Sequence, residues 1–455
     1  MSDSKMTRRA FLAATTTTAV VIAAGGCATK PNTARVVPRK LSPNEKLNIA
    51  GIGVGGMGGG DVNGCGEENI VALCDVDWLK AEETFYKFRN AKRFFDFRKM
   101  LEKMDKEIDA VTVSTPDHVH APATYMAMKM GKHVRVQKPM THTIAEARLM
   151  AKTAAETGVT TMMGNQGHCG DGVRELCEML WAGTIGEVTE AHVWTDRPIW
   201  PQGIEKPLKA EDPPDTINWN LWLGPAPVRP YNPGYAPFKW RGWWDFGCGA
   251  IGDMACHIMD PAFWSLKLYE APSYTVEVVQ QEGMTKQTPP RKSVIKYTFP
   301  ARAGMGPVTL YWYDGKIKPP RPQGVPEEQK LGDGDNGSLF IGTKGIMTSG
   351  CYGGESRLLP DELMKDFKRP EPTIPRIPDG NSYKHWIECC KKGEKTVSDF
   401  SYAGPLTEVA NMGNVALLAG KKIEFDVAKM KITNCWKANK YLTKKYRKGW
   451  DFMPL

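Results

Sequence analysis

The sequence predicts an α/β domain with a parallel, doubly wound sheet, followed by an α+β domain with an open, mainly antiparallel sheet. Three observations support this fold class: a glycine-rich turn directly after an apolar strand, an alternation of strands and helices up to about residue 170, and later segments in which apolar and polar residues alternate. With 455 residues, 41% of them hydrophobic, the chain has enough apolar material for two packed domains.

The first residues predict an export signal that is separate from the fold. Arg8 and Arg9 precede a short apolar stretch from Phe11 to Ala24, which is typical of a twin-arginine signal and too short to span a bilayer as a mature helix. If Cys27 is lipidated, the protein would be a membrane-anchored lipoprotein, and otherwise periplasmic. We expect residues 1–27 to be the signal and residues 28–45 a linker, with no transmembrane helix after them.

Composition argues against several other classes of protein. The net charge of +9 is spread along the chain, with a denser basic patch only near the C-terminal tail, 441–455, and no recognition motif accompanies it. We therefore expect no nucleic-acid partner. The eleven cysteines have neither a disulfide-framework spacing nor a zinc-ligand spacing, which predicts mostly buried thiols and no metal site.

The glycine-rich stretch "GIGVGGMGGG" predicts a dinucleotide-binding Rossmann domain. Gly51, Gly53 and Gly56 fit G-x-G-x-x-G, in which a pyrophosphate lies against backbone N–H groups where the next helix begins, here at Met57. A second apolar strand ends at Asp75, whose carboxylate can accept the ribose hydroxyls of the adenosine half and would repel a 2'-phosphate. The combination predicts NAD rather than NADP as the cofactor.

The alternation of strands and helices predicts a Rossmann domain over residues 46–170 and a substrate and oligomerisation domain over residues 171–440. Ligands of a doubly wound sheet bind beyond the carboxyl ends of its strands. Polar residues at these ends are Ser114, Thr115, Pro116, Lys138, Asn165, Gln166 and His168. The amides would meet the nicotinamide carboxamide or a sugar hydroxyl, and His168 either binds substrate or packs as a loop histidine.

Two of these segments, "STPDHVHAPA" and "VQKPM", resemble the Gfo/Idh/MocA family of NAD(P)-dependent sugar and polyol oxidoreductases. The later segment "WWDFGCGAIGDMACHIMD" is also similar to that family, including its exported bacterial branches, and the likeness extends over nearly the whole chain. The resemblance implies that the first segment, including His120, lies near the nicotinamide ribose and that Lys138 is the active-site lysine. Most members carry Glu before this lysine, where this chain has Gln137.

Asp253 and His257 lie four residues apart, which places them on one face of a helix. The resemblance implies that both line the substrate pocket with Lys138. His257 would take the hydroxyl proton, Asp253 would bind the sugar or orient the imidazole, and Lys138 would stabilise negative charge on oxygen. The alternative is that Asp253 caps the helix and His257 is a core histidine.

Alternating residues in the second half predict strands of an antiparallel sheet, at 186–195, 274–282, 293–301 and 307–315. Between the first two lies a loop, 196–245, that is rich in proline and tryptophan. A loop of this length is usually functional. Arg197, Trp200 and Trp240 are candidates for a carbohydrate pocket, because aromatic rings stack on sugar C–H faces; alternatively, the tryptophans only anchor the loop.

Together these patterns predict a homo-oligomeric NAD-dependent oxidoreductase that transfers a hydride between nicotinamide and a carbinol of a sugar, polyol or glycoside. We expect a tightly bound cofactor, because NAD is scarce outside the cytoplasm. Two alternatives stay open. One is an NAD-dependent glycosidase that works by oxidation, elimination and re-reduction with no net redox change, and the other is a non-catalytic, NAD-carrying sugar-binding protein.

Overall fold

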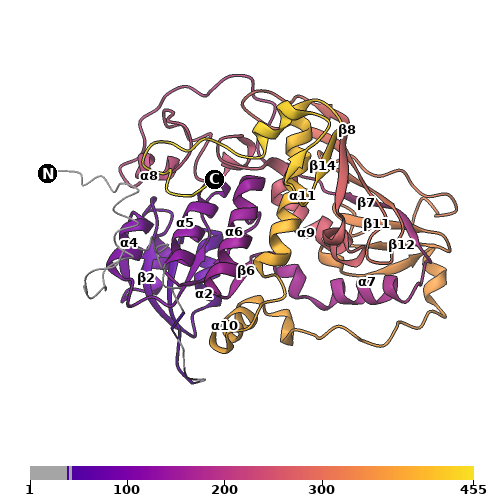
Figure 1. Cartoon of the computed structure of the whole chain (residues 1–455), viewed down its shortest axis with the longest axis horizontal. Helices are drawn as coiled ribbons and strands as arrows, with labels where there is room; N and C mark the ends of the chain where they lie inside the picture. Colours follow the sequence, from indigo (N-terminus) through magenta and orange to yellow (C-terminus); the bar gives the residue numbers. More distant parts are fainter. Residues whose placement is uncertain (1–37, 40–41, 43) are drawn as a thin grey trace, which may run out of the picture.

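The structure is a computed structural model that describes residues 38–39, 42 and 44–455, so the predicted signal and Cys27 lie outside the described residues. Two sheets lie side by side with helices between them, and the C-terminus lies over the helices of the first unit (Figure 1). One sheet is parallel and the other is mainly antiparallel. This arrangement confirms the fold class predicted from the sequence.

The first unit has six parallel strands, namely β1 (Asn48–Ile52), β2 (Asn69–Cys74), β3 (Lys92–Phe94), β4 (Ala110–Val113), β5 (His133–Val136) and β6 (Thr161–Met163). Its helices are α2 (Met57–Gly64), α3 (Glu82–Lys87), α4 (Phe97–Lys103), α5 (Asp117–Lys129) and α6 (Ile144–Thr157). The strand order is β3-β2-β1-β4-β5-β6. In this order the chain reverses direction across the sheet between β1 and β4, and ligands bind beyond the carboxyl ends of the strands at that point.

The second unit has nine strands, namely β7 (Val188–Trp194), β8 (Ser273–Glu282), β9 (Lys292–Phe299), β10 (Val308–Tyr313), β11 (Gly337–Gly342), β12 (Ile346–Ser349), β13 (Arg357–Leu359), β14 (Ile423–Asp426) and β15 (Lys431–Ile432). Their order is β13-β12-β11-β7-β10-β9-β8-β14-β15, and β7 and β10 form its parallel pair. The four predicted segments correspond to β7–β10. The strands β11–β15 were not expected. β12–β15 have only two to four residues, too few to show alternation, and the apolar residues of β11 are consecutive.

Four further helices complete the second half of the chain: α7 (Asp171–Trp181), α9 (Gly249–Ser265), α10 (Ser382–Lys392) and α11 (Phe400–Ala419). The helix α11 packs against both α6 and α9, and Figure 1 shows it between the two sheets. One hydrophobic core contains Val111 of the first sheet and Leu310 of the second. Because this core is continuous, α9 has a fixed position beside the parallel sheet.

The connection from β7 to α9 folds back onto the first unit. It contains α8 (Trp219–Leu223) and is held together by an aromatic cluster that includes Trp222, Tyr235 and Trp243. The backbone N–H of Asn218 donates to the carbonyl of Val76 at 2.7 Å, which attaches the loop directly after β2. The loop therefore forms a wall beside the carboxyl ends of the first sheet.

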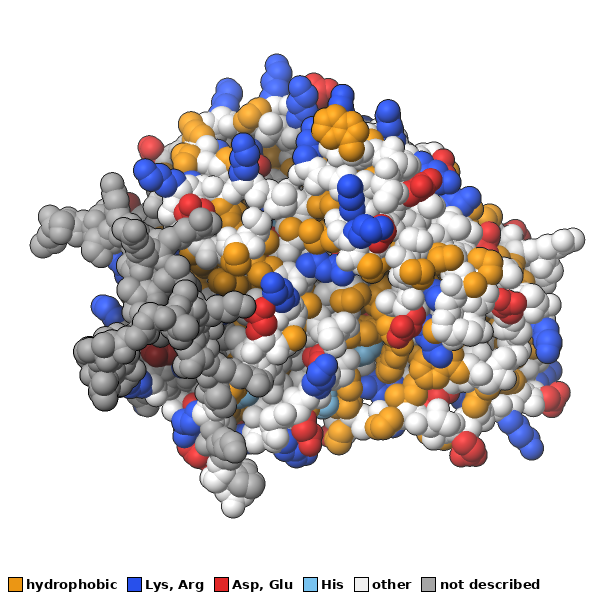
Figure 2. Space-filling model, viewed as in Figure 1, with side chains coloured by type: hydrophobic (Ala, Val, Ile, Leu, Met, Phe, Trp, Pro, Cys, Tyr) orange, Lys and Arg blue, Asp and Glu red, His pale blue; other side chains and the backbone are white. Residues whose placement is uncertain are grey.

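The basic tail also packs against the first unit. The ring of Trp450 lies 5.9 Å from that of Phe97, and the Arg98 guanidinium lies 4.2 Å from the Trp450 ring. Elsewhere on the face seen in Figure 2, Lys and Arg side chains are spread among Asp and Glu, as the diffuse charge of the sequence predicts. The tail is thus part of the fold and a candidate for a role in ligand binding.

The helix α5 begins at Asp117 and accommodates Pro122 in its second turn. All ten cysteines within the described ranges are free, and eight of them are buried. The same part of the chain contains no helix that is long and apolar enough to cross a membrane, and no group of His, Cys, Asp and Glu that could hold a metal ion.

Candidate active site and cofactor cleft

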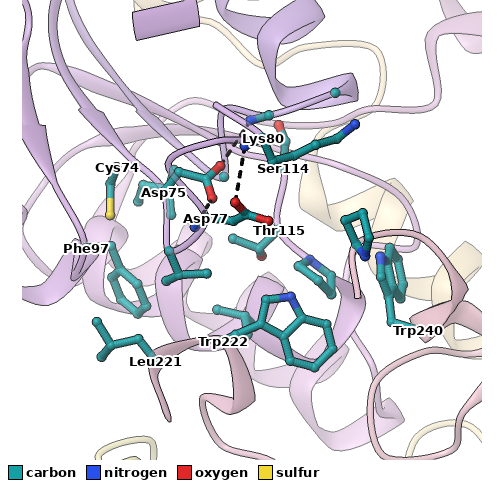
Figure 3. Close-up of a pocket in the computed structure, with 18 of the residues that line it drawn as sticks. Cys74, Asp75, Asp77, Lys80, Phe97, Ser114, Thr115, Leu221, Trp222 and Trp240 are labelled. Carbon is teal, nitrogen blue, oxygen red and sulfur yellow. Dashed lines mark hydrogen bonds between the residues drawn. The ribbon is translucent and has the colours of Figure 1, made fainter. Parts of the chain in front are cut away.

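A cavity of about 330 Å³ lies at the carboxyl ends of β1, β2 and β4. Asp75, Ser114 and Thr115 lie on one side of it, and Leu221 and Trp222 of α8 lie on the opposite side (Figure 3). Trp450 of the tail also lines it. The cavity is therefore placed where a doubly wound sheet binds its ligands, and it is enclosed by segments distant in sequence.

The three glycines that shape the turn each lie two residues later in the sequence than predicted. Gly53 has φ +74° and turns the chain directly after β1, and Gly55 approaches the cavity. An added Cβ on Gly58 would lie 1.7 Å from the Gly53 carbonyl oxygen, so Gly58 allows α2 to pack against the turn. This geometry matches G-x-G-x-x-G at Gly53, Gly55 and Gly58.

This register corrects the predicted role of Gly51. Gly51 lies inside β1, where an added Cβ would be 2.6 Å from Val54 and 2.7 Å from Val62, so its role is core packing and not cofactor contact. Gly56 and Met57, which were predicted to contact the cofactor, both line the cavity. The first glycine of the sequence pattern was chosen wrongly, because the ten-residue stretch contains two overlapping matches to the same spacing.

Asp75 holds the glycine turn in position. Its carboxylate accepts backbone N–H groups of Val54 at 2.7 Å, Gly55 at 3.0 Å and Asp77 at 2.9 Å. Burial raises the pKa of Asp75 to about 6 in spite of these bonds, which lower it. A carboxylate at the end of β2 that faces the cavity fits a ribose with two free hydroxyls.

The turn after β4 completes the fit to a dinucleotide. Ser114, Thr115 and Pro116 all line the cavity. The Oγ1 atom of Thr115 is buried and has no hydrogen-bond partner among the described residues. Such an orphan hydroxyl, a glycine turn that tolerates no Cβ and an acidic residue after β2 are features that suit NAD.

Lys138, Asp253 and His257 converge beside this cavity, although none of them lines it. The Lys138 Nζ donates to the carboxylate of Asp253 at 2.8 Å and to its backbone carbonyl at 2.6 Å. Arg241, which does line the cavity, donates from Nε to the same carboxylate oxygen at 3.2 Å. Arg241 thus connects the predicted catalytic residues to the cleft.

Burial and nearby charges set the protonation states of Asp253 and His257. Burial alone would raise the pKa of Asp253, but the Lys138 and Arg241 cations outweigh it and lower that pKa to about 2. Burial lowers the pKa of His257 to about 3, and the Lys138 ammonium adds to this effect. Asp253 is therefore an anion and His257 a neutral imidazole at neutral pH.

The structure excludes the capping part of the alternative for this pair. Asp253 lies in the second turn of α9, which begins at Gly249, so it does not cap the helix. His257 is buried and packs against Tyr352, and its Nδ1 atom has no hydrogen-bond partner among the described residues. A buried ring nitrogen without a partner is a candidate for a substrate contact.

A neighbouring carboxylate explains why position 137 carries Gln and not Glu. Its Nε2 donates to both oxygens of Asp61, at 2.8 and 3.0 Å, and Asp61 also accepts from the hydroxyls of Ser114 and Tyr383 at 2.6 and 2.8 Å. Asp61 is 1% exposed. A Glu at position 137 would place a second carboxylate against this buried one, whereas the amide supplies a donor.

Tyr352 was not predicted but lies directly against His257. Their rings are 5.0 Å apart and nearly perpendicular, and the Gln166 side chain lies 3.4 Å from the Tyr352 hydroxyl. Tyr352 has φ 61° and ψ 20°, a left-handed conformation that is rare for a bulky residue, and 36% of it is exposed. Backbone strain of this kind is concentrated at functional sites.

Four other predicted ligand residues are buried and do not line the cavity. His120 lies between the carbonyls of Thr115 and Pro139, at 2.7 and 2.8 Å. His168 bonds to Asp260 at 2.9 Å, as the packing alternative expects. Asn165 accepts from Ser398 at 2.6 Å, and its buried Nδ2 has no partner among the described residues. Trp200 donates to Gln202 at 2.9 Å, and its ring lies 5.9 Å from the Arg241 guanidinium.

In the long loop, Trp240 and Arg197 have different positions. Trp240 lines the cavity, and the Arg241 guanidinium lies 4.2 Å from its ring. Arg197 forms an ion pair with the adjacent Asp196 and does not line the cavity. Of the three candidates in this loop, the structure brings only Trp240 to the cleft.

The fold and the site together define the class of two-domain oxidoreductases with an NAD-binding Rossmann domain. The family pattern described as "Oxidoreductase family, NAD-binding Rossmann fold" matches residues 47–165, and that described as "Oxidoreductase family, C-terminal alpha/beta domain" matches residues 184–300. The chain belongs to the Gfo/Idh/MocA oxidoreductase family.

Curated relatives match parts of the chain. "Glycosyl hydrolase family 109 protein 2" of Shewanella sp. (strain ANA-3) is 29% identical over 206 residues, which are 41% of this chain and 45% of that protein. "D-glucoside 3-dehydrogenase" of Escherichia coli (strain K12) is 30% identical over 119 residues, or 26% of this chain and 33% of that protein. The match therefore covers less than half of either relative.

Solved structures share the fold over most of the chain. A levoglucosan dehydrogenase in complex with NADH and L-sorbose has a TM-score of 0.57 at 14% identity and covers 84% of this chain and 99% of its own. At this level of identity the likeness shows the architecture alone. The chemistry of this protein has to be argued from its own residues.

Gly58→Ala should prevent the glycine turn from closing, because the new methyl group would overlap the Gly53 carbonyl. We expect loss of bound NAD and a lower melting temperature, although alanine has the higher helix propensity by about 1 kcal/mol. Cofactor content by mass spectrometry and thermal unfolding measure both effects. Gly60→Ala is the matched control, since its nearest heavy atom would be 4.0 Å away; equal behaviour of the two variants would contradict this account.

Gln137→Glu should destabilise the protein by at least about 2 kcal/mol, because it removes a donor to the buried Asp61 carboxylate and adds a second charge. Urea unfolding measures the loss, which should diminish at acidic pH. Asp61→Asn in the same chain should restore much of the stability. Gln281→Glu, at an exposed position, is the control; a full-sized loss there, or none at position 137, would argue against the explanation.

Proposed function

We propose that the protein is an NAD-dependent oxidoreductase that acts on a carbinol of a sugar, polyol or glycoside. The observation that carries this proposal is the cluster of Lys138, Asp253 and a neutral His257 joined to the cofactor cleft through Arg241. When bound, NAD would supply the acceptor or donor of the hydride. Asp75, Thr115 and the backbone of the glycine turn would hold it.

In the direction of oxidation, His257 takes the proton of the substrate hydroxyl. A neutral imidazole can do so, and the adjacent ammonium of Lys138 stabilises negative charge as it develops on that oxygen. Asp253 fixes the ammonium, since its side chain and its backbone carbonyl both accept from Nζ. Lys138 thus keeps one further N–H for the substrate.

The surroundings of His257 support a carbohydrate substrate. Trp240 lines the cleft, and Tyr352 offers an exposed ring and a hydroxyl group beside His257. Burial raises the pKa of Tyr352 to about 12, so this hydroxyl stays a hydrogen-bond donor at neutral pH. The names of relatives such as D-glucoside 3-dehydrogenase and levoglucosan dehydrogenase agree with this substrate class.

A second candidate is a redox-neutral glycosidase in which the same cofactor is reduced and reoxidised within one cycle. The position of α8 and Trp450 along the cleft favours it, because their contacts with a bound cofactor would help to retain it between turnovers. The relatives named glycosyl hydrolase family 109 proteins also agree with it. Tight cofactor retention would suit export through the twin-arginine route, which the first residues predict.

His257→Asn should lower kcat by about 10²- to 10⁴-fold, as expected for loss of a general base. The measurement is single-turnover hydride transfer with a panel of sugars and glycosides. His385→Asn, at a half-buried histidine on α10, is the control and should retain activity. Full activity of the His257 variant would end the proposed mechanism, and bound NAD without transfer to any sugar would favour a non-catalytic carrier.

The pH profile of the wild type should lack an acid limb at the ordinary histidine pKa. A base with a folded-state pKa of about 3 stays neutral as the pH falls through 6.5, so kcat at saturating cofactor should hold to about pH 5 or lower. Lys138→Met should move the limb to higher pH, because it removes a cation that lowers the pKa of His257. An unshifted limb in that variant would contradict the assignment.

Tyr352→Gly should separate activity from stability. Glycine relieves the left-handed strain, so the free energy of unfolding should change by less than about 1 kcal/mol, whereas kcat/KM should fall about tenfold or more. Tyr352→Phe keeps the ring against His257 and should retain most of the activity. A large loss of stability with unchanged kcat/KM would show that Tyr352 has only a structural role.

Product analysis separates the two candidate reactions. The oxidoreductase should convert a sugar with stoichiometric formation of NADH, whereas the glycosidase should release free sugar and aglycone without net NADH. Mass spectrometry of the protein-bound cofactor and of products from substrates deuterated at single carbons measures both. Return of the deuterium to the same carbon would support the redox-neutral cycle.

A further inference from the structure

A second cavity, of about 390 Å³, lies outside the site described above. It is formed by the start of α6, the middle of α11, the residues before α9 and the C-terminal tail. It shares no lining residue with the cofactor cleft and contains none of Lys138, Asp253 and His257. Nothing in the proposed hydride transfer uses it.

A buried acceptor without a partner lines this cavity. Asn411 is 3% exposed, and its Nδ2 donates to the carbonyl of Thr141 at 3.1 Å, which fixes the orientation of the amide. The Oδ1 atom therefore faces away from that bond, and it has no hydrogen-bond partner in the part of the chain that the structure describes. Because an unpaired buried acceptor is costly, a small side-chain movement that opens Oδ1 to the cavity would let a ligand hydroxyl or N–H pair with it.

The mouth of the cavity carries an excess of positive charge. Lys286 and Lys445 are exposed lining residues, and neither forms an ion pair with a described residue. Lys444 is already bound to Glu146 at 3.1 Å and to His142 at 2.7 Å. The acidic lining residue, Asp245, is paired with Arg229. Two cations are thus free to meet an anion.

The remaining wall is apolar and partly aromatic. Trp244, Val415 and Leu418 line it. Trp244 donates its Nε1–H to the carbonyl of Thr285 at 3.1 Å, which fixes the indole. A fixed indole beside aliphatic side chains suits the C–H face of a sugar ring.

We propose that this cavity is a separate binding site for a carbohydrate that carries an anionic group. Lys286 and Lys445 would bind the anion, Asn411 Oδ1 would accept a sugar hydroxyl, and Trp244 would lie against the ring. An inorganic anion has no hydroxyl-bearing ring to match the amide and the indole, and a neutral sugar leaves the lysines without a counter-charge. Carboxylate, sulfate and phosphate groups share the required chemistry.

Calorimetric titration of the full chain tests the proposal with D-galacturonate, D-glucose 6-sulfate, D-glucose 6-phosphate and uncharged D-galactose. At least one anionic sugar should bind more tightly than D-galactose, and which one identifies the anionic group. Binding should persist in His257→Asn, which separates this site from the proposed catalytic site. Binding that is lost in that variant, or that shows no preference for the anionic sugars, overturns the proposal.

Two kinds of variant locate the site. Lys286→Ala with Lys445→Ala should weaken binding about fivefold or more, whereas Lys365→Ala with Lys368→Ala, which removes the same charge at exposed positions elsewhere, should not. Leu418→Trp should block the cavity, with thermal unfolding as the check that the chain folds. If it does not fold, the lysine pair decides, and unchanged affinity in that pair overturns the proposal.

Discussion

The ion pair between Lys138 and Asp253 is the contact on which the site depends. Lys138 follows β5 of the parallel sheet, and Asp253 lies on α9 of the second unit, so the 2.8 Å bond joins the two halves of the chain. It lowers the pKa of Asp253, contributes to the neutral state of His257 and places α9 beside the cofactor cleft. Arg241 extends the same contact to the cavity wall. A change at either end would therefore alter the geometry and the protonation of the whole cluster.

A second buried cluster holds Gln137, the residue directly before Lys138. Asp61 of α2 accepts from Gln137, Ser114 and Tyr383. Asp61 lies on the glycine-turn helix, and its partners lie after β5, after β4 and on α10. One carboxylate therefore connects the turn that would hold the cofactor to the residue before the predicted active-site lysine. Gln137, where the resemblance to the family led us to expect Glu, is then a consequence of where the buried charge lies. The carboxylate is on α2, and position 137 supplies the donor.

The sequence predicted the parts of this arrangement that are local. The order of strands and helices, the residues after β2, β4 and β5, and the helical spacing of Asp253 and His257 all follow from short patterns. Gly58 was missed because only packing against Gly53 distinguishes two overlapping glycine patterns. Arg241 and Tyr352 were missed because they reach the site from a long loop and from a short turn after β12, and no local pattern encodes such contacts. Trp200 and His168 have suitable side chains for a sugar site, but both are buried and hydrogen-bonded to Gln202 and Asp260, which local sequence could not show.

The two sides of the site differ in how they are closed. The cofactor side lies under α8 and Trp450, which are held by the loop's bonds to the backbone after β2 and by packing on Phe97. The side next to His257 is bordered by Tyr352 and Gln166, both of which are exposed. A small molecule that approaches His257 from the Tyr352 side would not disturb the aromatic cluster, whereas α8 and Trp450 border the cofactor side. In the proposed reaction this asymmetry favours a cofactor that stays bound through many turnovers, which in turn requires that each hydride taken up be returned to a second substrate or to the same one.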